Sequence, residues 1–179
     1  MPILLNFLAF QFGWLACVLG GAYGLPWLGT GLAMALIAAH IRWTANPRRE
    51  LILILTIGVL GAAWDSLLVA LGWLIYPSGT LIAGTAPHWI VAMWMLFATT
   101  LNVSLRWLHG RLLLATVLGA LGGPLAYFAG YRLGGVEFSQ LWVGLTALGL
   151  GWAVLMPLLT VLAERFDGMR QSLPQTAYA

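Results

Sequence analysis

The sequence predicts an all-α polytopic membrane protein built as a bundle of six transmembrane helices. Of its 179 residues, 61% are hydrophobic and only 7% are charged, whereas soluble domains are about 25% charged. The mean hydropathy of +0.93 also indicates a membrane protein. Four long stretches, 1–41, 66–105, 112–131 and 138–163, contain no Asp, Glu, Lys or Arg. This composition excludes a soluble globule, which needs a charged surface, and a disordered chain, which needs low hydrophobicity.

Turn residues divide these stretches into helices of the length that a bilayer requires, about 20 apolar residues each. The helices are expected at 3–23, 26–43, 50–76, 88–108, 111–131 and 141–163. The breaks that separate them are, in chain order, Gly24-Leu25-Pro26, Thr44-Ala45-Asn46-Pro47, Pro77-Ser78-Gly79, Leu108-His109-Gly110 and Gly134-Gly135. Residues 1–163 therefore form a single transmembrane domain, and 164–179 form a short cytoplasmic tail.

Arginine indicates the orientation, because the sequence contains no lysine. With six spans, one side of the membrane holds Arg42, Arg48, Arg49, Arg106, Arg111, Arg165 and Arg170, and the other side holds Arg132. Cytoplasmic loops of membrane proteins carry an excess of basic residues. Both termini are therefore expected in the cytoplasm, and the same split favours six spans over five. The positive net charge has this origin, so nucleic acid is not an expected partner.

Asp65 lies near the middle of the third expected helix. A charged carboxylate at the bilayer centre costs about 2.5–3.5 kcal/mol, and every arginine lies at or near a helix end. Asp65 is therefore either protonated or in contact with a water-filled cavity, and in both cases it faces the inside of the bundle. It belongs either to a polar, proton-coupled pocket or to a hydrogen bond with Asn102 or Gln11 that fixes helix packing.

Three of the ten tryptophans, Trp14, Trp64 and Trp152, are expected near mid-depth. They either line a cavity for an apolar or aromatic ligand or fill space against the many glycines. The Gly122-Gly123-Pro124 kink has two corresponding interpretations, the border of a transport site or simple packing. The candidate ligand-binding residues are Gln11, Trp14, Trp64, Asp65, Thr99 and Asn102.

The sequence offers little for catalysis or metal binding. The three histidines lack the spacing of metal ligands, and we expect no metal and no cofactor. A group of polar residues on the expected cytoplasmic side forms either an acid–base cluster or a solvated loop edge; these are His40, Glu50, His109, Glu164 and Asp167.

Four segments resemble one family. They are residues 6–20, Asp65-Ser66-Leu67-Leu68 with Gly72, residues 94–102, and residues 119–134 around Gly123-Pro124-Leu125-Ala126-Tyr127. The chain resembles, nearly from end to end, an uncharacterised domain-of-unknown-function family of small polytopic bacterial inner-membrane proteins. This resemblance implies a multi-pass protein of the bacterial inner membrane without an assigned catalytic residue. It also implies a membrane-lipid pathway, because such proteins tend to be encoded beside enzymes similar to cyclopropane-fatty-acid synthases.

Four classes of function follow. The protein binds or transports a small apolar or amphipathic molecule, serves as a non-catalytic accessory subunit of a lipid-modifying enzyme, uses Asp65 as an acid or base, or senses a ligand. The last class rests on the spacing of Pro87, Trp89 and Trp94. The expected partners are membrane lipids, a small apolar ligand and a membrane-lipid-modifying enzyme.

Overall fold

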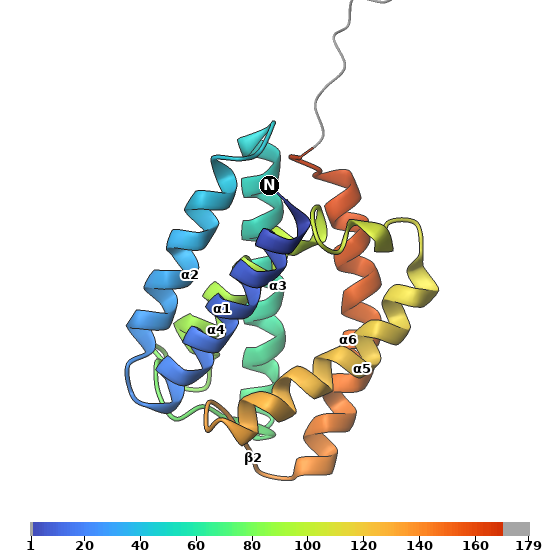
Figure 1. Cartoon of the computed structure of the whole chain (residues 1–179). Coiled ribbons are helices and arrows are strands. Elements are labelled where there is room, and N and C mark those ends of the chain that lie inside the picture. Colours follow the sequence, from blue (N-terminus) through green and yellow to red (C-terminus); the bar gives the residue numbers. More distant parts are fainter. Residues whose placement is uncertain (1, 170–179) are drawn as a thin grey trace, which may run out of the picture.

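The structure is a computed structural model that describes residues 2–169, and it is built from helices (Figure 1). In the described range these are α1 (Ile3–Ala22), α2 (Pro26–Ile41), α3 (Pro47–Ala70), α4 (His88–Leu101), α5 (Leu112–Arg132) and α6 (Leu141–Arg165). A short 3₁₀ helix, Arg106–Leu108, follows α4, and two-residue strands β1 (Leu74–Ile75) and β2 (Glu137–Phe138) form an antiparallel pair. The all-α prediction with six helices is confirmed.

Four of the helices, α1, α3, α5 and α6, are long and apolar enough to cross a membrane. Their outer faces carry exposed Leu, Ile and Val side chains, which is the surface expected of a protein in lipid. The other two, α2 and α4, have 16 and 14 residues. Most of α4 is buried, because it packs against α1, α2 and α3.

The third helix differs from its expected bounds of 50–76 at both ends. It begins at Pro47, because Asn46 caps it by accepting a hydrogen bond from the Arg49 N–H at 3.2 Å. It ends at Ala70, because Gly72 adopts a φ of +69° and closes the helix: the Gly72 N–H bonds the Val69 carbonyl and the Trp73 N–H bonds the Leu68 carbonyl. The chain then continues into β1.

The fourth helix was expected to reach residue 108 but ends at Leu101. Polar side chains beyond Leu101 give the backbone other partners. Arg106 Nε donates to the Asn102 carbonyl at 2.8 Å, and the Ser104 N–H donates to Asn6 Oδ1 at 3.3 Å. The expected helix is therefore replaced by turns and the 3₁₀ segment. The sixth helix continues to Arg165, and the expected tail beyond residue 169, including Arg170, lies outside the described residues.

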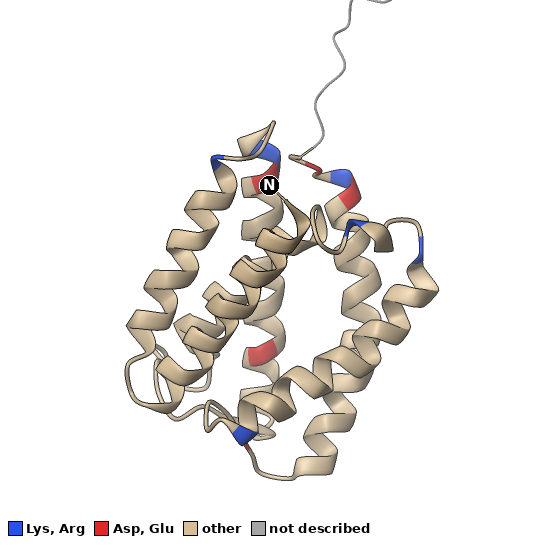
Figure 2. Ribbon diagram, in the orientation of Figure 1, with Lys and Arg blue, Asp and Glu red and all other residues tan. Residues whose placement is uncertain are grey.

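Basic residues gather at one end of the bundle, where α2 and α6 end and α3 begins (Figure 2). Arg132, the last residue of α5, is the basic residue of the opposite end among those described. The charge pattern of the sequence therefore corresponds to two distinct ends of the folded bundle, with the apolar helices between them.

α5 lies obliquely across α6 (Figure 1) and packs closely against it. Glycines allow this approach: a methyl group at Gly119 would overlap the backbone carbonyl of Trp152, and one at Gly123 would overlap the Trp152 ring. Near the C-terminal end of α5, Gly135 approaches Val18 of α1. From that contact α1 and α5 diverge toward the other end of the bundle (Figure 1).

The Gly119 contact gives a first prediction. Gly119→Ala should lower the free energy of unfolding by about 2 kcal/mol, because the added methyl meets backbone and forces α5 away from α6. Gly122→Ala is the matched control, since a methyl group there meets nothing within 4 Å. Thermal and denaturant unfolding in detergent micelles measures both variants. Equal stabilities would show that the approach of α5 to α6 is not limited at Gly119.

Candidate functional site

Asp65 is fully buried and accepts hydrogen bonds from three aromatic side chains. The Tyr76 hydroxyl donates to Oδ1 at 2.6 Å, and Trp94 Nε1 donates to Oδ2 at 2.6 Å. The Tyr127 hydroxyl lies 2.8 Å from Oδ1 and 2.9 Å from Oδ2. The donors come from the segment after β1, from α4 and from α5. One carboxyl group therefore ties α3 to three other parts of the fold.

These donors replace the partners expected from the sequence. The hydrogen bond predicted from Asp65 to Asn102 or Gln11 is wrong. Asn102 lies eight residues after Trp94, about 12 Å further along the chain at the rise of a helix, and its Nδ2 donates to Glu50 at 3.4 Å. Gln11 is exposed on α1. The Thr99 hydroxyl donates to the Leu96 carbonyl of its own helix at 2.7 Å.

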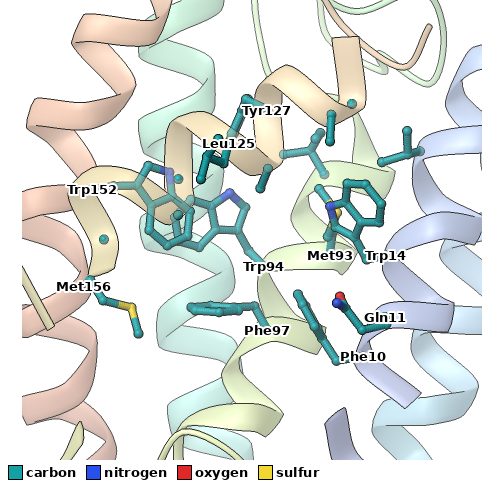
Figure 3. Close-up of a pocket in the computed structure, with 18 of the residues that line it drawn as sticks. Phe10, Gln11, Trp14, Met93, Trp94, Phe97, Leu125, Tyr127, Trp152 and Met156 are labelled. Carbon is teal, nitrogen blue, oxygen red and sulfur yellow. The ribbon is translucent and has the colours of Figure 1, made fainter. Parts of the chain in front are cut away.

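A cavity of about 590 Å³ lies among α1, α4, α5 and α6. Its walls are almost entirely apolar and aromatic. Figure 3 shows the main lining side chains: Phe10, Gln11 and Trp14 from α1, Met93, Trp94 and Phe97 from α4, Leu125 and Tyr127 from α5, and Trp152 and Met156 from α6. The volume is in the range of small-molecule sites, which run from about 300 to 1,000 Å³.

The Asp65 carboxyl group lies directly behind one wall of this cavity. Its three donors, Tyr76, Trp94 and Tyr127, all line the cavity, while Asp65 itself is 0% exposed. A molecule in the cavity would therefore contact the aromatic donors and would experience the carboxyl group through them.

The three mid-depth tryptophans divide between the two interpretations. Trp14 and Trp152 line the cavity, and Trp152 stacks on Trp94 with ring centroids 4.7 Å apart and planes inclined by 12°. Trp64 fills space, because its ring occupies the position that a methyl group at Gly151 would take. Among the described residues, Trp64, Thr99 and Asn102 lie outside the cavity lining.

Sequence reasoning missed the donors of Asp65, although a signal for them existed. A buried carboxyl group needs hydrogen-bond donors, and Tyr and Trp supply them at positions that are otherwise apolar. Tyr127 follows Pro124 on the same face of α5, and Trp94 lies near the middle of α4. Which of the aromatic residues meets Asp65 depends on contacts between elements that are distant in the chain.

A second polar cluster lies where α3 begins. Glu50 is fully buried and His40 is 2% exposed, and His40 Nε2 lies 2.8 Å from Glu50 Oε1. Glu50 Oε2 accepts from the Gly168 N–H at 3.2 Å and from Asn102 Nδ2 at 3.4 Å. This pair is buried, so it is not a solvated loop edge.

The other members of the expected cluster make separate contacts. Glu164 accepts a hydrogen bond from the Gly110 N–H at 2.7 Å, and Arg106 pairs with Asp167 at 2.8 Å. His109 Nε2 lies 3.0 Å from the Leu101 carbonyl. Within residues 2–169, no group of three or more His, Cys, Asp or Glu side chains is arranged to hold a metal ion.

Residues 3–158 match a family described as Protein of unknown function (DUF2878). The chain belongs to this family. The expected membership of a family of unknown function is thereby confirmed. No curated protein and no solved structure matches the chain. The DUF2878 region contains Asp65 and every residue of the cavity lining, whereas Gly168, whose N–H donates to Glu50, follows it.

Proposed function

We propose that this DUF2878 protein binds or transports a small apolar or amphipathic molecule in the cavity among α1, α4, α5 and α6. The observation that carries the proposal is a cavity of about 590 Å³ with aromatic walls, backed by a fully buried carboxyl group. Such a combination of apolar walls and few polar groups is typical of ligand sites.

The ligand would contact Gln11 and Trp14 on α1, and its polar group would lie against Tyr76 and Tyr127. Asp65 would act through these hydroxyl groups. This arrangement disfavours direct acid–base catalysis by Asp65, because no substrate atom reaches a carboxyl group that is 0% exposed. Trp64, Thr99 and Asn102 would support the walls rather than touch the ligand.

Cavity filling tests the proposal. Gly122 lines the cavity, and a methyl group there meets nothing within 4 Å, so Gly122→Leu should fold and occupy ligand space. The neutral fluorescent dye N-phenyl-1-naphthylamine, added to protein in detergent micelles, should bind this variant about tenfold more weakly than the original protein, the effect of about 1.4 kcal/mol.

Gly31→Leu is the matched control, because Gly31 is equally open but lies on α2 outside the lining. It should leave dye binding unchanged. Equal dye binding by both leucine variants would refute the cavity as the binding site, and a lipid extract with bulk phospholipid alone would favour the accessory-subunit function.

We further propose that the bundle crosses a bacterial inner membrane six times, with both termini in the cytoplasm. Two features support this: six helices, and basic residues concentrated at one end of the bundle (Figure 2). The short α4 is surrounded by other helices, so its length need not match the bilayer. The connections on its two sides would complete the crossing.

Reporter fusions test this topology. A reporter active only in the periplasm should be silent when fused after Ala179, because the positive end would face the cytoplasm. The same reporter inserted in the 77–87 loop should be active. Activity at the C-terminus would overturn both the orientation and the even number of spans.

A further inference from the structure

We propose that the cavity binds a neutral, lipid-soluble carbonyl compound, such as a ketone, quinone or ester, whose oxygen accepts hydrogen bonds from Gln11 and Trp14 of α1. This inference rests on the proposed function and names the chemical class of the ligand. The proposed function puts one polar group of the ligand against Tyr76 and Tyr127. The polar side chains of α1 call for a hydrogen-bond acceptor on the other side of the cavity (Figure 3).

Two polar side chains point into the cavity from the middle of α1. Gln11 and Trp14 are three residues apart, so they lie on one face of the helix. Figure 3 shows the Gln11 amide and the Trp14 indole nitrogen directed toward the cavity. Within residues 2–169, neither side chain makes a hydrogen bond. An unpaired amide or indole N–H is costly in an apolar environment, so a ligand that pairs with both recovers that cost.

The unpaired polar groups of the lining are mostly donors. The Trp14 indole only donates, and the Gln11 amide offers two N–H groups besides its oxygen. On the α6 side of the cavity, Trp152 Nε1 is buried and has no partner among the described residues. The tyrosine hydroxyls of the lining are already hydrogen-bonded to Asp65. A carbonyl oxygen, which only accepts, therefore matches this lining better than a hydroxyl or an amine, which brings a further donor.

The lining carries no charged group that would hold an ion. Among the described residues, it contains no Asp, Glu, Lys, Arg or His. Asp65 is 0% exposed behind the wall, so no ligand atom pairs with it directly. Moving an ion into apolar surroundings without a partner is costly. The ligand is therefore expected to be neutral.

The cavity is open to molecules that dissolve in the membrane. Leu125 and Trp107 line it and are 66% and 49% exposed on the outer surface of the bundle. Gln11 is also exposed, so its amide lies near the mouth, where α1 and α5 diverge (Figure 1). Hydrocarbon offers no hydrogen-bond donors. A lipid-soluble carbonyl compound that enters here therefore gains hydrogen bonds that it lacks in the bilayer.

Two probes of the same shape test the inference. In 2-isopropenylnaphthalene a methylene group replaces the carbonyl oxygen of 2-acetylnaphthalene. Equilibrium dialysis measures the binding of each probe to the purified protein in detergent micelles, relative to its partition into empty micelles. The ketone should bind about tenfold more tightly than its methylene analogue, which is the effect expected of one or two hydrogen bonds.

Gln11→Met combined with Trp14→Phe removes both donors and nearly keeps the size of the side chains. This variant should reduce the advantage of the ketone to about twofold or less. It should still bind N-phenyl-1-naphthylamine, which carries no carbonyl group, so dye binding shows that the cavity is intact. The single variant Gln11→Met, at an exposed position, should lower the advantage about threefold.

Gln140→Met combined with Trp142→Phe is the matched control. It makes the same two substitutions at exposed residues outside the cavity lining. Because these side chains do not reach the ligand, the control should keep the full advantage of the ketone.

Equal binding of the ketone and its methylene analogue by the original protein would overturn the inference, as would an undiminished advantage in the variant that lacks both α1 donors. If N-phenyl-1-naphthylamine binds and is excluded by Gly122→Leu while the two probes are not distinguished, the carbonyl inference fails and the proposed function stands. If neither the dye nor the ketone binds, both fail together.

Discussion

Asp65→Leu is expected to lower the free energy of unfolding by about 5 kcal/mol, because it leaves three buried donors without an acceptor at about 1–3 kcal/mol each. Those donors are the Tyr76 and Tyr127 hydroxyls and the Trp94 indole N–H. Asp65→Asn should cost far less, about 2 kcal/mol, since its amide oxygen still accepts. Thermal and denaturant unfolding in micelles compares the two variants.

Removing two of the three donors, the tyrosine hydroxyls, together with the acceptor provides the control. Replacing both partners of a buried hydrogen bond by apolar groups is close to neutral. Asp65→Leu combined with Tyr76→Phe and Tyr127→Phe should therefore recover much of the stability that Asp65→Leu alone loses. If Asp65→Leu is as stable as Asp65→Asn, the hydrogen bonds at this centre do not hold the bundle together.

The helices were predictable because their signals are local. Uncharged stretches and Gly or Pro breaks place each helix. Asn46-Pro47 is a strong start signal, and α3 begins there, three residues before the expected start at residue 50. The inward position of Asp65 was predictable because a carboxyl group is costly in lipid. Its burial follows from that cost alone, without knowledge of any partner.

The partners of Asp65 were not predictable in the same way. Thr99 and Asn102 were matched to its depth on the assumption of a helix reaching residue 108. Because α4 ends at Leu101, Asn102 lies at the level of Glu50 instead. The cavity depends on the approach of α5 to α6 and the divergence of α5 from α1, which are long-range properties that no local pattern encodes.

The buried state of Glu50 was missed for a similar reason. The sequence places this residue near the start of a helix on the cytoplasmic side, where solvent is the ordinary environment. The segment after α6 folds back over it: the Asn46 N–H donates to the Gly168 carbonyl at 2.8 Å, and the Gly168 N–H donates to Glu50. A contact across more than a hundred residues has no signal in a single sequence.

Glu50→Ala is expected to lower the free energy of unfolding by about 4 kcal/mol, because removing one member of a buried pair costs about 3–5 kcal/mol. His40 Nε2, Asn102 Nδ2 and the Gly168 N–H would all lose their acceptor. Glu164→Ala is the matched control: Glu164 is exposed and accepts a hydrogen bond from the Gly110 N–H, so its loss should cost about 0.5 kcal/mol. Unfolding in micelles measures both.

A Glu50→Ala cost as small as that of Glu164→Ala would show that the cluster does not join α2, α3 and α4 to the segment after α6. The combination His40→Leu with Glu50→Leu should be milder than Glu50→Ala, because it leaves no unpaired imidazole in the interior.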